Sequence, residues 1–227
     1  PAVIYFARRH QTEGAKVAVI SRGYGRRVKS EEPLVVSEPE RGVLVSPEVS
    51  GDEPYLLALK LPGVPVIVCP DRIRAAKLAI EKFHPHILLL DDGFQHRSIR
   101  RDEDIVVIDC SNPFGYGRLL PRGLLREPLC SLRRATQLLL THADERKHAW
   151  VADKPKEINQ NAEILLSRHQ PVKLFIPSKN ESAPLSLLKG TPILALSSIG
   201  NPSSFEWTLK KLGARTLETL RFPDHHW

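Results

Sequence analysis

The sequence lacks several features that would place it in a common class of protein. It contains no methionine and only three cysteines, none in a CxxC pair, so neither a disulfide framework nor a zinc-binding cysteine cluster is expected. No apolar run approaches the length of a membrane-spanning helix, about 18 residues, and no signal peptide is expected. A chain that begins at Pro1 and has no methionine is expected to lack its natural start.

Aromatic residues are also scarce, at 6% of the chain, and they are not interleaved with basic residues. This argues against a basic nucleic-acid-binding module, which would use such aromatics for stacking. The charge balance is nevertheless positive, with 33 Lys and Arg against 26 Asp and Glu and a net charge of +7. Such a charge favours anionic partners, namely nucleic acid, phosphorylated ligands or an acidic membrane face, although a basic solvated surface explains it equally well.

Short apolar runs alternate with amphipathic segments along most of the chain. Strands are expected at 17–21, 33–37, 65–69, 86–92, 104–110 and 136–144, and helices before Gly14 and at 51–61 and 71–83. Apolar rather than alternating strands indicate an α/β fold with a mostly parallel sheet flanked by helices. The composition turns polar after Asp144, which predicts a first domain at 1–146 and a smaller α/β domain at 147–227.

The stretch ILLLDDGFQHR places Asp91 and Asp92 directly after an apolar strand. A carboxylate held at the end of a strand is what a Walker B element uses to bind Mg²⁺ beside nucleotide phosphates. Adjacent residues of a strand point to opposite faces, so Asp91 is expected to face the metal and Asp92 other groups of the site. An ordinary strand-ending turn at Asp92 is the alternative.

Other polar clusters follow predicted strands and are expected on the same edge of one sheet, where α/β proteins bind ligands. SRGYGRR at 21–27 offers arginines for phosphate, or forms a basic surface loop. Asp52, at a helix start, is either a catalytic base or a favourable partner of the helix dipole. The 111–128 loop mixes leucines with arginines and suits either an anionic amphiphile or a lid packed by its own leucines.

Taken in order, VISRGYGRR, GDEPYLLA, LLLDDGFQHRSIRRDEDIVVID, FGYGRLLPRGLLREP, THAD and FPDHHW resemble the tetraacyldisaccharide 4′-kinases, the lipid A 4′-kinases of Gram-negative bacteria. The resemblance implies a P-loop kinase that transfers the γ-phosphate of ATP, with Mg²⁺, to the 4′-hydroxyl of tetraacyldisaccharide 1-phosphate to give lipid IVA. It implies work at the cytoplasmic face of the inner membrane, on an anionic membrane surface and not on nucleic acid.

The resemblance also assigns roles to individual residues. It implies Asp52 as the catalytic base with His225 as its partner, although His226 stays open, and Asp91 as the metal ligand. The nucleotide site would include Tyr24, Asp92 and His96. Contacts to phosphate or lipid would come from Arg72 and Arg122.

The family's Walker A motif, roughly GGTGKTP, is expected immediately before Pro1, so this polypeptide by itself is expected to have no kinase activity. Two rival classes stay open: another P-loop nucleotide-hydrolysing enzyme or sugar kinase, and, more weakly, the basic nucleic-acid-binding module.

Overall fold

The computed structural model describes residues 1–143 and 148–223. The chain divides into two compact units, Pro1–Arg168 and His169–Trp227, so the boundary predicted after residue 146 falls inside the first unit. The first unit extends past residue 146 because its last strand, at Glu163–Leu166, pairs with the strand at Gln137–Thr141.

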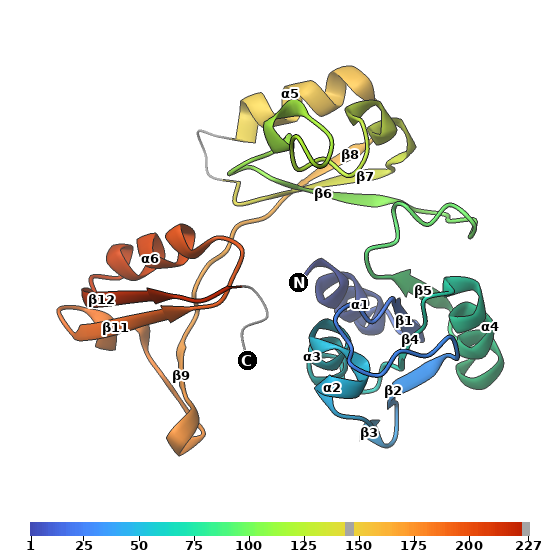
Figure 1. Cartoon of the computed structure of the whole chain (residues 1–227), viewed down its shortest axis with the longest axis horizontal. Helices are drawn as coiled ribbons and strands as arrows, with labels where there is room; N and C mark the ends of the chain where they lie inside the picture. Colours follow the sequence, from blue (N-terminus) through green and yellow to red (C-terminus); the bar gives the residue numbers. More distant parts are fainter. Residues whose placement is uncertain (144–147, 224–227) are drawn as a thin grey trace. The chain divides into compact units, whose positions relative to one another are not determined.

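The first sheet has the strand order β3-β2-β4-β1-β5 (Figure 1). Its strands are β1 (Val17–Ser21), β2 (Leu34–Glu38), β3 (Gly42–Val43), β4 (Val66–Val68) and β5 (Ile87–Leu90). β4 and β5 flank β1 in parallel, whereas β2 is antiparallel to both β4 and β3. Every residue of β1 is buried, which explains why the VAVIS run is apolar and β-branched rather than alternating.

Helices cover both faces of this sheet. They are α1 (Ala2–Thr12), α2 (Pro47–Ser50), α3 (Asp52–Lys60) and α4 (Arg72–Phe83). Residues of α1 and α3 pack with Val17 and Val19 of β1, whereas α4 packs with Ala18 and Ile20 on the opposite face. The start of α4 is fixed by Asp71, whose Oδ1 accepts the backbone N–H of Ile73 at 2.8 Å.

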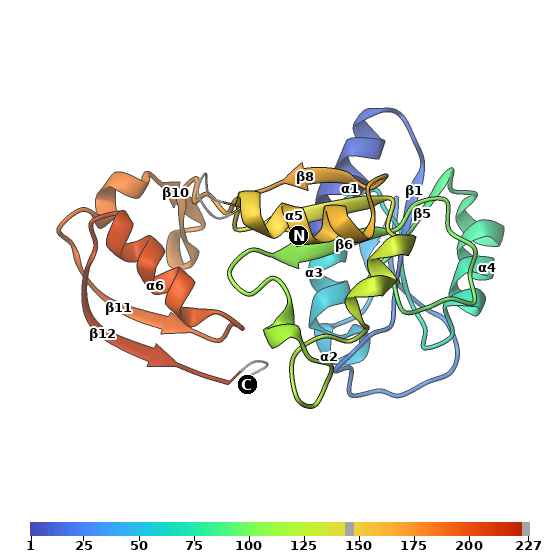
Figure 2. The same ribbon diagram turned by 90° about the horizontal axis from the view of Figure 1, so that it is seen from above.

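A second, separate sheet follows, of order β6-β7-β8 and parallel throughout (Figure 1), and Figure 2 shows its strands β6 and β8 from above. Its strands are β6 (Ile105–Asp109), β7 (Gln137–Thr141) and β8 (Glu163–Leu166), and α5 (His148–Ile158) contributes the buried Val151 to its core. The expectation of one shared sheet edge is therefore wrong, since β5 and β6 are not paired. β8 is absent from the predicted strands because its apolar run is short.

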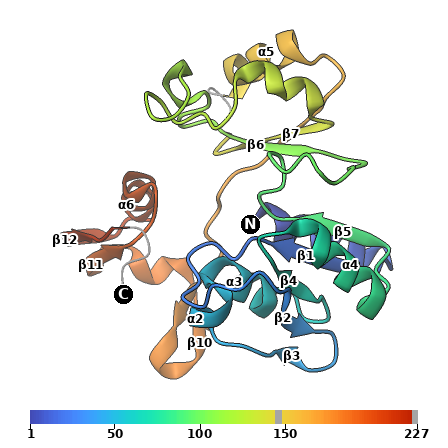
Figure 3. The same cartoon turned by 45° about the vertical axis from the view of Figure 1, so that its right-hand side comes forward.

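The second unit is a smaller α/β unit (Figure 3). It contains the antiparallel pair β9 (Leu174–Ile176) and β10 (Glu181–Ala183), the parallel pair β11 (Pro192–Ser197) and β12 (Arg215–Arg221), and α6 (Pro202–Lys211). Short 3₁₀ helices of the chain lie at Gly115–Gly117, Leu129–Arg134, Pro177–Lys179 and Leu185–Leu188. Leu188, Ala195 and Leu209 form the core of this unit.

Ile67→Ala tests the packing of the central strands. Ile67 is 0% exposed and packs with residues of β1 and α4. The cavity left by the smaller alanine should therefore lower the free energy of the opening that exposes the β1 amides by about 2–5 kcal/mol. Ile80→Ala on α4, at a side chain 52% exposed, is the matched control and should cost much less. Hydrogen exchange of the β1 amides measures both, and equal losses for the two variants would contradict this packing.

Candidate functional site

The carboxyl ends of β4, β1 and β5 meet at one edge of the first sheet. Ser21 is in register with Val68, and Ile20 is in register with Leu90. The pairing continues one residue further, because the backbone N–H of Asp91 donates to the Ile20 carbonyl at 2.8 Å. Residues that follow these three strands are therefore neighbours in space, as the parallel arrangement predicts.

Asp91 is the most enclosed carboxylate of this edge. The Ser21 hydroxyl donates to its Oδ2 at 3.2 Å. Burial raises the pKa of Asp91 above its ordinary value, and the charge of Asp92 adds to this, while the Ser21 hydrogen bond and the charge of Arg72 act in the opposite direction. The Arg72 guanidinium therefore lies near this acid, and Ala2 and Val3 of α1 line the same cavity as Asp91.

Asp92 has different surroundings, although it is the next residue. β5 ends at Leu90, and Asp92 adopts a left-handed backbone conformation with φ of 49°, so the strict strand alternation no longer applies. Its carboxylate is 62% exposed and accepts from Nη1 of Arg126 at 2.6 and 2.7 Å. The pKa of Arg126 is raised, first by Asp92 and also by Glu53, which places the first turn of α3 near the same ion pair.

Arg72 is a buried cation facing this acidic pair. Only 5% of it is exposed, and Nη1 donates to the Pro70 carbonyl at 3.1 Å. Burial lowers the pKa of Arg72 first, the charge of Arg22 lowers it further, and Asp92 and Asp91 raise it. Its Nε is buried and has no hydrogen-bond partner within residues 1–143 and 148–223, which is a donor available to an anionic ligand.

Asp52 reaches this edge through a close backbone contact. A Cβ added to Gly51 would lie 2.8 Å from the Tyr24 carbonyl, and one added to Gly23 would lie 2.1 Å from Val68 Cγ1. Both glycines also have positive φ, of 92° and 71°. Larger residues are therefore excluded both by the lack of space and by the backbone conformation. The contact brings the start of α3, with Asp52 as its first residue, against the loop that follows β1.

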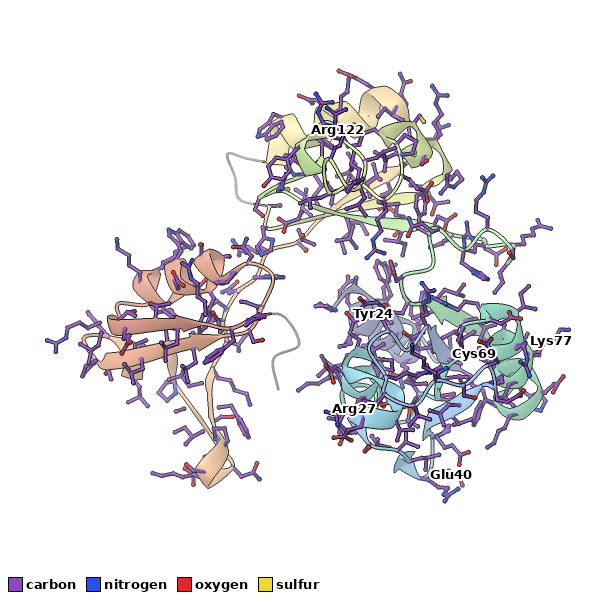
Figure 4. All side chains as sticks on the ribbon, viewed as in Figure 1. Tyr24, Arg27, Glu40, Cys69, Lys77 and Arg122 are labelled. Carbon is purple, nitrogen blue, oxygen red and sulfur yellow. The ribbon has the colours of Figure 1, made fainter. Side chains whose placement is uncertain are left out.

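Other predicted residues take less central places. The Tyr24 ring is exposed, and the exposed Arg122 lies on a different segment (Figure 4). The backbone N–H of His96 donates to the Gly93 carbonyl at 2.9 Å, and its buried Nε2 has no partner in the described part of the chain. His225 lies outside the described residues.

Asp91 and Asp92 also line a cavity of about 920 Å³, which is bordered by residues of α1, α4, β5 and β6. Arg126 lines the same space. Its volume lies within the range of small-molecule sites, roughly 300–1,000 Å³. Both acids therefore border open space rather than packed core.

The donor set is not that of a closed metal cage. Within 1–143 and 148–223 no cluster of three or more His, Cys, Asp or Glu side chains could hold a metal by itself. Mg²⁺ is typically bound by one or two carboxylates together with phosphates and water, and Asp91 fits that pattern. In the same ranges, no helix is both long and apolar enough to cross a membrane.

The family model for tetraacyldisaccharide-1-P 4′-kinase, LpxK, matches residues 1–227. The chain belongs to this family.

The relatives of this LpxK-family chain are longer than the chain itself. It is 42% identical to the tetraacyldisaccharide 4′-kinase of Halothermothrix orenii, over 100% of this chain and 62% of the relative. It is 43% identical to that of Anaeromyxobacter dehalogenans, over 100% and 60%. A crystal structure of LpxK from Aquifex aeolicus, described as an apo form in complex with ATP, matches with a TM-score of 0.70 and 36% identity, over 99% of this chain and 66% of that one.

A polar joint in this LpxK-family chain connects the segment after Asp92 to the second sheet. Glu127 accepts from Gln95 Nε2 at 3.1 Å and from Arg134 Nη2 at 2.9 Å. The Arg134 guanidinium also lies 4.2 Å from the centre of the Phe94 ring. Sequence reasoning named neither Glu127 nor Arg134, and it did not single out Arg126, because three arginines recur every four residues in the 111–128 loop and nothing in that spacing distinguishes them.

The second sheet carries its own polar pair at the carboxyl end. Asp109 Oδ1, at the last residue of β6, and His142 Nδ1, just after β7, lie 3.0 Å apart. Partial burial tends to raise the pKa of Asp109, but hydrogen bonds from Ser111 and the interaction with His142 outweigh it, and the pKa is lowered. This pair explains the polar ends of DIVVID and LLLTH without assigning them to the first site.

Glu127→Gln tests the joint through its pH dependence. Burial tends to raise the pKa of Glu127, but hydrogen bonds from Ser131, Arg134 and Gln95 lower it below the ordinary value of 4.5. A lowered carboxyl pKa stabilises the fold above the unfolded pKa, and this is lost as the pH falls through the folded pKa. The variant should therefore lose about 1–3 kcal/mol of unfolding free energy at pH 7.

The difference from the wild type should shrink as the pH falls below 4.5. Glu40→Gln, at an exposed glutamate, is the control and should change little. Urea unfolding across the pH range measures both variants. A pH-independent loss would show that Glu127 acts by packing rather than by charge.

Proposed function

We propose that this chain carries the catalytic core of a kinase that transfers the γ-phosphoryl group of ATP to the 4′-hydroxyl of tetraacyldisaccharide 1-phosphate, giving lipid IVA. Family membership supports this proposal. The single observation that carries it is the buried Asp91 at the end of β5, held by Ser21 and faced by Arg72. An acid and a buried cation whose charges interact suit a metal-bound polyphosphate.

The phosphates are proposed to lie between the start of α1 and the arginines. The first N–H groups of a helix lack intrahelical partners and carry partial positive charge, so they bind phosphate. Ala2 and Val3 of α1 line the same cavity as Asp91, which supports α1 as that helix. Arg72, with its unpartnered Nε, would donate to a phosphate oxygen, and Tyr24 would lie beside the nucleotide.

Asp91 is the proposed ligand of Mg²⁺, which would neutralise charge on the β- and γ-phosphates. The Ser21 hydroxyl occupies Oδ2 and so orients the carboxylate. Asp92 is proposed as a second group of the nucleotide site, currently engaged by Arg126. His96, whose backbone N–H donates to the Gly93 carbonyl in the turn after Asp92, is proposed as a further group of the nucleotide site.

Asp52 is the proposed base that accepts the proton of the sugar hydroxyl, with His225 as its partner. A base must lie beside the transferred group because phosphoryl transfer depends mainly on positioning and charge. The close fit of Gly51 against the loop after β1 supports this position. Arg72 and Arg122 are proposed to contact phosphate or lipid.

The acceptor's four acyl chains make a membrane the natural place of work. We place the enzyme peripherally on an anionic surface, the cytoplasmic face of the inner membrane. The net charge of +7 supports such a partner. Nucleic acid is not a proposed partner.

Asp52→Asn in the full-length product of the gene that encodes this chain tests the proposed base. The amide keeps the shape but accepts no proton, so kcat should fall about 10²–10⁴-fold, while the Kd for ATP should change less than threefold. Phosphate transfer from labelled ATP to tetraacyldisaccharide 1-phosphate measures turnover, and calorimetry measures ATP binding.

The matched control is Asp153→Asn, because Asp153 is an exposed aspartate on α5 that does not line the cavity, and it should keep full activity. Near-normal turnover of Asp52→Asn would remove the base assignment. No transfer by the wild type to this acceptor, with ATP hydrolysis intact, would instead favour another P-loop enzyme.

A further inference from the structure

The loop between β6 and β7 exposes an unusual amount of apolar surface. Seven consecutive residues, 116–122, are exposed. Among them Tyr116 is 76%, Leu119 45% and Leu120 60% exposed, and Leu124, just beyond, is 59% exposed. The alternative of a lid packed by its own leucines is therefore wrong for these side chains.

Backbone contacts, not side-chain packing, hold this loop in shape. The N–H of Gly123 donates to the Leu119 carbonyl, and that of Leu124 to the Gly115 carbonyl, each at 3.0 Å. Gly115 and Gly123 are buried at the base, where a Cβ on Gly123 would lie 2.2 Å from the Arg118 carbonyl. These backbone contacts fix the conformation of the loop. The exposed leucines therefore contribute little to holding it in shape.

Its charge has one sign. Arg118 and Arg122 flank the two adjacent leucines, and no Asp or Glu occurs from residue 110 to 126. Both arginines are exposed, and no hydrogen bond or ion pair of their side chains is found within the ranges that the structure describes. Leucines beside unpaired cations complement a surface that is apolar inside and anionic outside.

We propose that the 115–124 loop docks the protein on an anionic lipid bilayer, with Leu119, Leu120 and Leu124 entering the interface and Arg118 and Arg122 binding lipid phosphates. The choice of a membrane rests on the proposed lipid acceptor, but the loop geometry does not. Arginines near an anionic surface each strengthen binding about fivefold, so the pair accounts for roughly 30-fold.

Vesicle sedimentation of the full-length gene product tests this proposal. The vesicles contain phosphatidylethanolamine with phosphatidylglycerol, or phosphatidylcholine alone. The variant Leu119→Ser/Leu120→Ser/Leu124→Ser should lose at least tenfold in affinity for the anionic vesicles. Arg118→Gln/Arg122→Gln should lose roughly 30-fold, and this loss should disappear on phosphatidylcholine.

Matched controls remove equal numbers of exposed residues elsewhere. Leu194→Ser/Leu196→Ser/Leu217→Ser removes leucines that are 58–61% exposed on β11 and β12, and Arg133→Gln/Arg215→Gln removes two exposed arginines. Both should bind vesicles like the wild type. Circular dichroism checks that all four variants fold. If a loop variant unfolds, the single substitution Leu120→Ser or Arg118→Gln replaces it.

Wild-type vesicle binding by the loop variants would overturn the proposal, and so would equal losses in the controls. If binding is unchanged while KM for the lipid acceptor rises, the loop contacts the acceptor instead, and the bilayer role is wrong. The vesicle assay needs no turnover. A failure of the kinase proposal would therefore appear separately, as a wild type that binds vesicles but does not phosphorylate the acceptor.

Discussion

The pairing of β5 with β1 is the constraint on which the candidate site depends. It continues past the strand end, where the Asp91 N–H donates to the Ile20 carbonyl and the Ser21 hydroxyl donates to the Asp91 carboxylate. These contacts fix a partly buried acid at the edge of the sheet. A slip of one residue would turn Asp91 to the other face and replace it with Leu90 or Asp92.

The two neighbouring acids at this sheet edge have different surroundings. Asp91 is enclosed and has a raised pKa, whereas Asp92 is exposed and bound to Arg126. The buried Arg72 faces both, with its own pKa lowered chiefly by burial. Such groups add little to stability, because burying charge is costly. They are better understood as a preorganised site for a ligand that carries both a metal and phosphate.

Much of this arrangement could be predicted from the sequence, because apolar strands followed by polar residues leave a clear pattern. The strands that became β1, β4 and β5 and the acids after them are of this kind. The division into two sheets could not be predicted, since apolar runs do not say which strand pairs with which. The role of Arg126 could not be predicted either, because its contact with Asp92 depends on the path of the loop and not on local spacing. The predicted boundary after residue 146 differs from the observed one after Arg168 because β8, which belongs to the first unit, is too short to be recognised in the sequence.

The most direct test uses Mn²⁺ in place of Mg²⁺ with ATP, and records paramagnetic broadening of amide signals in the full-length gene product. The account predicts that Gly23, Gly51 and Gly93, which lie after β1, before α3 and after β5, broaden together and only when nucleotide is present. Gly14 and Gly63, before β1 and β4, should broaden far less. Broadening confined to one of the three segments, or stronger at Gly14 and Gly63, would contradict a shared site of Asp52 and Asp91.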